Sequence, residues 1–86
     1  MSHILIKGDE AYYDHVFDIA RQEITIMSEE DKAYYLNHPD YDEHHFGYGM
    51  YLRNYYIYGK LKVLEPDNMS EDIFETIISL LKKDKA

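Results

Sequence analysis

The sequence predicts a small all-α domain of three to four helices, preceded by a short N-terminal strand or arm. Its 86 residues are enough for one domain with a modest core. Apolar residues recur at helical spacing in two long stretches, and Ser, Asp, Gly and Pro stand where helices begin and end. We therefore treat residues 1–86 as one domain, with an arm (1–8), an acidic helical half (9–43) and a half that holds a central motif and the last helix (44–86).

The first predicted helix covers residues 10–27 and begins after Asp9, which can cap it. Its apolar residues recur at steps of four and three, which places them on one face. They are Tyr13, Phe17, Ala20, Ile24 and Met27, with Val16 beside them. We expect this face to be buried and Glu23 to lie elsewhere. Ser28 is the predicted N-cap of a second helix at 29–37, which Pro39 ends.

A third helix is expected at 43–58, although Gly47 and Gly49 each cost it about 1 kcal/mol relative to Ala. Either a neighbour packs close to the backbone at these glycines, or they form a turn and the helix begins at Met50. Gly59 is a natural stop, and 60–65 reads as an extended linker or a strand. Ser70 is the predicted cap of the last helix, whose apolar face holds Ile73, Phe74, Ile77, Ile78 and Leu81.

The negative charge is confined to the first half of the chain. Residues 1–47 hold eleven acids and three bases, whereas residues 48–86 hold six of each, so the net charge of −8 lies entirely before residue 48. Such a surface repels phosphate backbones, so we expect no direct binding to a nucleic-acid backbone and favour a basic protein partner. The alternative is that the acids only keep the protein soluble. With no cysteine and no apolar run long enough to span a membrane, a cytoplasmic protein without membrane attachment is expected.

Two short motifs resemble a known family. The first is Phe46-Gly47-Tyr48-Gly49-Met50-Tyr51-Leu52-Arg53-Asn54, and the second is Pro66-Asp67-Asn68-Met69-Ser70. Together they resemble an uncharacterised bacterial domain of unknown function, whose members carry F-G-x-G-M-x-x-R-N followed by P-D-D-M-S and an apolar helix. The chain departs from that pattern at Asn68, and has Tyr51 and Tyr56 where the family often has Trp. The resemblance implies a shared fold and central element in a bacterial protein, and no mechanism.

Arg53 and Asn54 are the most suggestive polar pair. As a binding site, the planar guanidinium would anchor a carboxylate or a phosphate. As structural elements, Arg53 would cap or bridge buried acids, and Asn54 would tie the loop before the last helix through Asp67. Arg–Asp pairing between the two motifs would then explain why both are present. We favour the structural role because buried polar groups must be paired.

Residues 38–45 crowd histidines and carboxylates into one window. They include His38, His44 and His45, with Asp40, Asp42 and Glu43 among them. Imidazole and carboxylate groups suit zinc, manganese or nickel, but the spacing matches neither a calcium loop nor a His-Glu-x-x-His helix. We expect a solvated acidic loop, with no metal and no cofactor. Ser28 and Ser70 read as caps rather than nucleophiles, so we expect no enzyme activity.

The ten tyrosines are the remaining signal, and six of them form adjacent pairs. Neighbouring side chains on a helix point about 100° apart, so some of these rings must be exposed. Tyrosine is favoured at protein interfaces, which makes Tyr48, Tyr51 and Tyr55 candidate binding residues beside Arg53 and Asn54. The predicted function is an acidic protein-interaction module, of the immunity or inhibitor type, for a basic partner. The alternatives are a homo-oligomer that packs through 46–58 and a metal-binding protein that uses 38–45.

Overall fold

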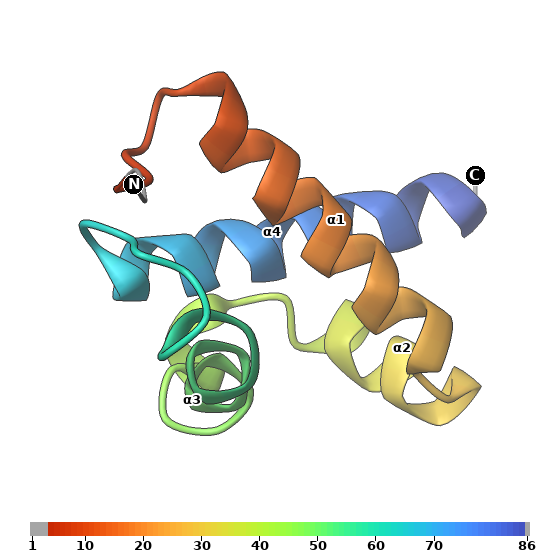
Figure 1. The fold of residues 1–86 in the computed structure, drawn as a ribbon. Helices are drawn as coiled ribbons and strands as arrows, with labels where there is room; N and C mark the ends of the chain where they lie inside the picture. The colour runs from red at the N-terminus through yellow and green to blue at the C-terminus, as the bar shows by residue number, and fades with distance from the viewer. Residues whose placement is uncertain (1–3, 86) are drawn as a thin grey trace.

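The computed structural model describes residues 4–85, and helices dominate this range (Figure 1). In chain order they are α1 (Glu10–Ile26), α2 (Glu29–Asn37), the 3-10 turn η1 (Tyr41–His44), α3 (Tyr48–Leu52), the π-helical turn η2 (Arg53–Ile57) and α4 (Pro66–Lys85). No strand forms within residues 4–85, so the predicted all-α fold is confirmed.

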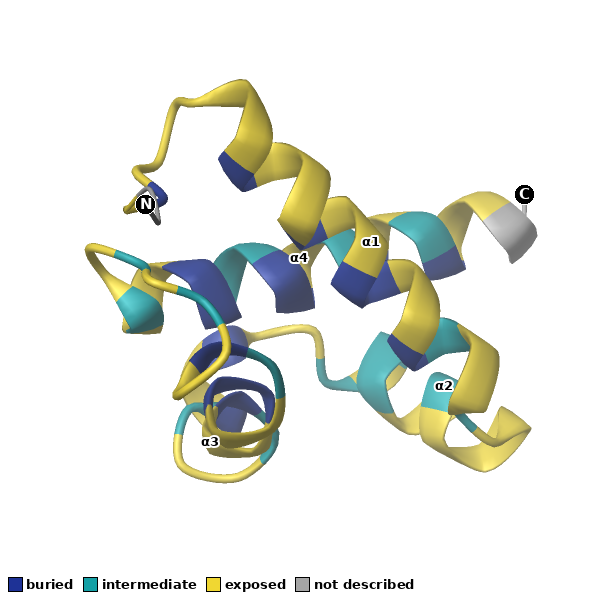
Figure 2. Ribbon diagram, viewed as in Figure 1, coloured by how far each residue is buried: buried dark blue, intermediate teal, exposed yellow. Residues whose placement is uncertain are grey.

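The last helix, α4, is the element around which the others are arranged. It packs against α1, α2, α3 and both short turns, and Figure 1 shows it running across the molecule between α1 and α3. Its buried residues are almost continuous along the inward side, which is dark blue in Figure 2. The predicted apolar face is confirmed, and Met69 and Ser70 extend it toward the N-terminal end.

α4 begins at Pro66, one turn earlier than the predicted start after Ser70. Proline suits the first helical position because its fixed φ is already helical and its missing N–H would have no intrahelical partner there. Ser70 therefore lies inside the helix, where it is fully buried, and the prediction that it caps the helix is wrong.

α1 buries a face that is rotated from the predicted one. Val16 and Ala20 are buried as expected, and Ile24 and Met27 are partly buried against the core. Tyr13 and Phe17 remain 46% and 44% exposed. The buried residues are Tyr12, Val16, Ile19, Ala20 and Glu23. This set also follows steps of four and three, but it includes a carboxylate, which the apolar pattern placed outside the core. The Asp9 side chain makes no capping hydrogen bond, although the helix does begin after it.

The second helix forms as predicted. The Ser28 hydroxyl accepts a hydrogen bond from the Asp31 amide at 3.1 Å, which satisfies one of the free amides of the first turn. α2 ends at Asn37, ahead of Pro39.

The helix predicted at 43–58 is divided into three parts. η1 ends at His44, α3 begins at Tyr48 after Gly47, and at Arg53 the helix widens into the π-helical turn, closed by the Tyr58 amide bonding to the Arg53 carbonyl at 2.7 Å. The predicted close approach holds for Gly49, where an added Cβ would lie 2.9 Å from Tyr41 Cζ. It does not hold for Gly47, which has open space around it.

The N-terminal arm docks on the linker before α4. Leu5 forms a single parallel bridge with Val63, and its amide donates to the Lys62 carbonyl at 2.7 Å. This pairing holds the buried Leu5 side chain against the core. Gly59 ends the π-helical turn with a φ of +77°, which confirms its predicted role as a stop.

Candidate functional site

The outer face of α3, η2 and the turns that flank them is an uncharged aromatic surface, which we call the α3 face. It comprises the exposed residues Phe46, Met50, Tyr51, Asn54, Tyr55 and Tyr58. Phe46 is 79% exposed and Tyr55 is 54% exposed, which is unusual for large rings. Between residues 46 and 58 the only charged side chain is that of Arg53, and it is buried. In a chain that is 30% charged, so long an uncharged surface is a distinct feature.

Tyrosine rings stack along this face. The rings of Tyr48 and Tyr51 stack at 5.6 Å between centroids, and those of Tyr51 and Tyr55 stack at the same distance. At the far end, Lys60 Nζ lies 4.6 Å from the centre of the Tyr55 ring and donates to the Tyr55 carbonyl at 2.7 Å. The stacking and this cation–π contact restrain the rings, so the face offers ordered aromatic surface.

A buried carboxylate on α1 holds the tyrosines of this region in place. Glu23 is only 2% exposed, and it accepts hydrogen bonds from Tyr48 at 2.5 Å, Tyr51 at 2.9 Å and Tyr56 at 2.6 Å. No ion pair to Glu23 occurs within residues 4–85, so these three hydroxyls are what stabilise the buried charge. The cluster ties α1 to α3 and η2 and so fixes the base of the α3 face.

The same contacts make these phenols weaker acids. Burial, and then the hydrogen bond to Glu23, raise the pKa of Tyr51 to about 12. The same two causes raise the pKa of Tyr48 and Tyr56 well above the ordinary tyrosine value. The three hydroxyls therefore remain protonated donors throughout the physiological range.

A second polar cluster lies between η2 and the start of α4. Arg53, 5% exposed, donates from Nη1 to the hydroxyls of Tyr41 at 2.9 Å and Ser70 at 3.0 Å, and from Nη2 to the His45 carbonyl at 2.9 Å. Its Nε lies 3.4 Å from Asp67 Oδ1. Arg53 and Asp67 thus pair across the two motifs, as the structural hypothesis expected, but Asp67 is 68% exposed and is not the buried acid that the hypothesis named. Asn54 is exposed, and it is Arg53 that holds Asp67.

The protons of this cluster can be assigned from its geometry. Ser70 donates its single hydroxyl proton to the Asp67 carbonyl at 2.9 Å, so at the 2.6 Å contact with Tyr41 the tyrosine must be the donor. Tyr41 and Ser70 then each accept one bond from Arg53. The hydroxyls and the guanidinium are thus used internally, and they tie the first motif to the second.

The predicted binding residues separate into two groups. Tyr51, Asn54 and Tyr55 are exposed on the α3 face, and Tyr48 is half-buried beneath it. Arg53 faces the interior instead. Of the residues expected to be structural, Gly49, Asp67 and Ser70 surround the Arg53 cluster, and Pro66 starts α4. Phe46, Gly47 and Met50 lie at the surface.

The histidine-rich window is also used for packing. His44 is buried among the rings of Tyr34, Tyr35 and Phe74, and its Nε2 lies 2.8 Å from the His38 carbonyl. Because a carbonyl only accepts, that nitrogen carries the proton. His38 Nδ1 lies 3.3 Å from Glu43, and His45 contacts Tyr41 edge-on. Within residues 4–85 no three histidine or acidic side chains gather in a way that could hold a metal ion.

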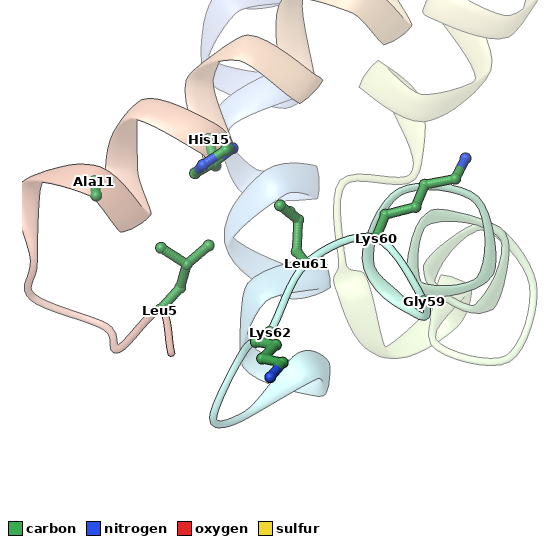
Figure 3. A pocket seen from close by; sticks show the side chains of 7 residues that line it. All are labelled: Leu5, Ala11, His15, Gly59, Lys60, Leu61 and Lys62. Atoms are coloured by element: carbon green, nitrogen blue, oxygen red, sulfur yellow. The ribbon is translucent and has the colours of Figure 1, made fainter. Parts of the chain in front are cut away.

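An open groove of about 570 Å³ lies between the arm, α1 and the linker. Figure 3 shows Leu5 and Leu61 facing each other on its floor, with His15 above them. The ends of Lys60 and Lys62 both point away from the groove (Figure 3). Lys60 already bonds to the Tyr55 carbonyl. No cation is directed at the apolar floor, so we assign no anion site here.

Two side chains that hold these polar clusters together, Glu23 and Tyr41, are not predicted from the sequence. The sequence pattern places Glu23 with the polar residues of α1 and Tyr41 in a loop. One feature of the sequence could have indicated that Glu23 is buried. Tyr12, Val16, Ile19 and Glu23 form a second row along α1 with the same spacing as the predicted apolar row.

The chain matches no protein-family model, no curated protein and no solved structure. The resemblance of the two motifs to a bacterial domain of unknown function therefore stays a prediction. None of the helices described in residues 4–85 is long and apolar enough to cross a membrane.

Proposed function

We propose that this protein is an acidic interaction module that acts by binding a basic protein, with the α3 face at the centre of the contact. The observation that carries the proposal is the uncharged aromatic surface of residues 46–58 in a chain with a net charge of −8. Protein interfaces commonly place aromatic residues at the centre and charged residues at the rim.

Exposed acids that precede this face in the sequence could form such a rim. Asp40, Asp42 and Glu43 precede it in the sequence, and all three are exposed. Ten of the eleven acids in residues 1–47 are exposed, and the only lysine or arginine paired with them within the described chain is Lys32, on Glu29. Unpaired exposed acids accelerate encounter with a positively charged surface. An immunity or inhibitor protein would use this arrangement to cover a basic cleft.

The test is capture of the partner from the native host, with wild-type protein and two variants of the α3 face, Phe46→Ala and Tyr55→Ala. We expect a basic protein at stoichiometric level, and binding about thirtyfold weaker in each variant if the ring is a central contact worth about 2 kcal/mol. Raising the salt concentration should slow association.

Phe17→Ala is the matched control, because Phe17 is an exposed aromatic residue on α1, outside the α3 face. It should bind the partner as the wild type does. The proposal fails if the recovered partner is acidic, or if Phe46→Ala and Tyr55→Ala bind as tightly as Phe17→Ala.

A homo-oligomer that packs through 46–58 has less support. A copy cannot pack closely at Gly49, because Tyr41 of the same chain takes that space, whereas Gly47 is open. The exposed tyrosines remain compatible with it. A metal-binding function has no cluster of ligands to rest on within residues 4–85.

A further inference from the structure

The last ring of the tyrosine stack on the α3 face is covered by a cation from the same chain. Tyr51 stacks on Tyr55 at 5.6 Å between ring centroids. The Lys60 ammonium lies 4.6 Å from the centre of the Tyr55 ring, and it donates a hydrogen bond to the Tyr55 carbonyl at 2.7 Å. The ring and the carbonyl together hold one positive charge, so this part of the α3 face is already built as a cation site.

The Tyr55 carbonyl can accept this bond because it lies at the end of η2. The amide of Tyr58 bonds to the Arg53 carbonyl, and the amide of Lys60 bonds to the Ile57 carbonyl. No backbone amide of residues 4–85 therefore bonds to the carbonyl of Tyr55. The unpaired carbonyls at the C-terminal end of a helix carry partial negative charge, which favours a cation.

Lys60 holds this site weakly. Its side chain is exposed, and it forms no ion pair within the described part of the chain. It points away from the neighbouring groove, so nothing there retains it (Figure 3). A cation–π contact at an exposed position is weak, and an ammonium group is strongly hydrated. Rotation of the lysine side chain alone would uncover the ring and the carbonyl.

An arginine side chain suits this site better than lysine does. A guanidinium is planar and more weakly hydrated than an ammonium, so it can stack flat on the ring face that Lys60 now covers. It also keeps donors for the Tyr55 carbonyl. The only charged side chain in residues 46–58 is that of Arg53, which is buried with its donors in use, so no exposed base in this segment repels a second cation. The net charge of −8 adds a general attraction.

We propose that an arginine side chain of the basic partner binds on the ring and the carbonyl of Tyr55, where it displaces Lys60. Lys60 is then a competitor within the chain, and it lowers the affinity for a partner that uses this site. The inference rests on the proposed function, because it names the chemical group with which the basic partner contacts the α3 face.

A tetra-arginine peptide with blocked ends is the probe, and the NMR signals of the Tyr55 ring report its binding. We expect these signals to shift in the wild type, and a tetra-lysine peptide of the same length to bind more weakly. Lys60→Ala should bind tetra-arginine about three- to sixfold more tightly, because it removes an exposed cation–π competitor. The captured partner should show the same order of affinities.

Lys62→Ala is the matched control. It removes the same charge from an exposed residue of the same linker, and Lys62 makes no cation–π contact within residues 4–85. It should bind tetra-arginine less than about twofold more tightly, from the change in net charge alone. Circular dichroism must show that both variants are as helical as the wild type.

Two results would overturn the inference. One is a Lys60→Ala variant that binds tetra-arginine no more tightly than Lys62→Ala does. The other is a wild-type titration, which requires no variant, in which tetra-arginine leaves the Tyr55 ring signals unchanged. Both leave the proposed function standing, since that fails only on the captured partner and on its binding to Phe46→Ala and Tyr55→Ala.

Discussion

Replacing Glu23 with Gln probes the cluster that supports the α3 face. The carboxylate accepts three phenol hydrogen bonds, each worth about 1.5–3 kcal/mol for a charged acceptor. Gln retains one acceptor oxygen, which can keep the two bonds now made to Oε2 at neutral strength, about 0.5–1.5 kcal/mol each. The amide nitrogen then faces Tyr48, whose proton loses its partner at a cost of about 1–3 kcal/mol.

The opposing effect is relief of the cost of burying a charge, which is several kcal/mol for an ion in a protein interior. Setting this against the lost bonds and the unpaired hydroxyl, we expect Glu23→Gln to lower the free energy of unfolding by about 2 kcal/mol. Urea unfolding followed by far-ultraviolet circular dichroism measures this change directly.

Asp18→Asn is the control for Glu23→Gln, because it removes an exposed acid from the same helix. It should change the free energy of unfolding by no more than about 0.5 kcal/mol. If Glu23→Gln were as stable as Asp18→Asn, the three tyrosines would not depend on the carboxylate, and the reasoning about the base of the α3 face would be refuted.

Two further predictions concern Gly49 and the buried phenols. Gly49→Ala should lower the free energy of unfolding by about 1–3 kcal/mol, because its Cβ would lie 2.9 Å from Tyr41 Cζ. Gly47 has open space around it, so Gly47→Ala should be nearly neutral in the same urea titration. The raised pKa of Tyr51, about 12 in the folded state against about 10 unfolded, stabilises the fold fully below about pH 10 and progressively less as the pH rises to about 12. The free energy of unfolding should therefore fall across that interval, and it should fall less in Glu23→Gln. A free energy of unfolding that stays constant across the interval would contradict the hydrogen bonds described.

The helices were largely predictable because their ends are marked by local chemistry. Ser28 and Pro39 bound α2, and Gly59 ends the π-helical turn. At α4 two valid start signals compete, since Pro66 suits a first helical position and Ser70 suits a cap. Pro66 prevails because Ser70 is needed inside, where it bonds to the Arg53 guanidinium.

The buried face of α1 could not be predicted from periodicity alone. Its two stripes have the same spacing, and Glu23 counts against the one that is buried. The carboxylate is tolerated because hydroxyls 25, 28 and 33 residues away reach it, and no local pattern reports such distant donors. The ion pair of Arg53 and Asp67 was easier to predict, because both residues lie in short motifs with few other charges.

Hydrogen–deuterium exchange on the complex with the captured basic protein tests the role of the α3 face most directly. Exchange reports which backbone amides a partner covers, and it requires no substitution. Binding should slow exchange in peptides spanning 46–58 and in the adjoining acidic segment 40–43, and leave the exposed side of α1 unchanged. Slowed exchange confined to α1 and α4, with 46–58 unaffected, would contradict the assignment of the α3 face as the docking surface.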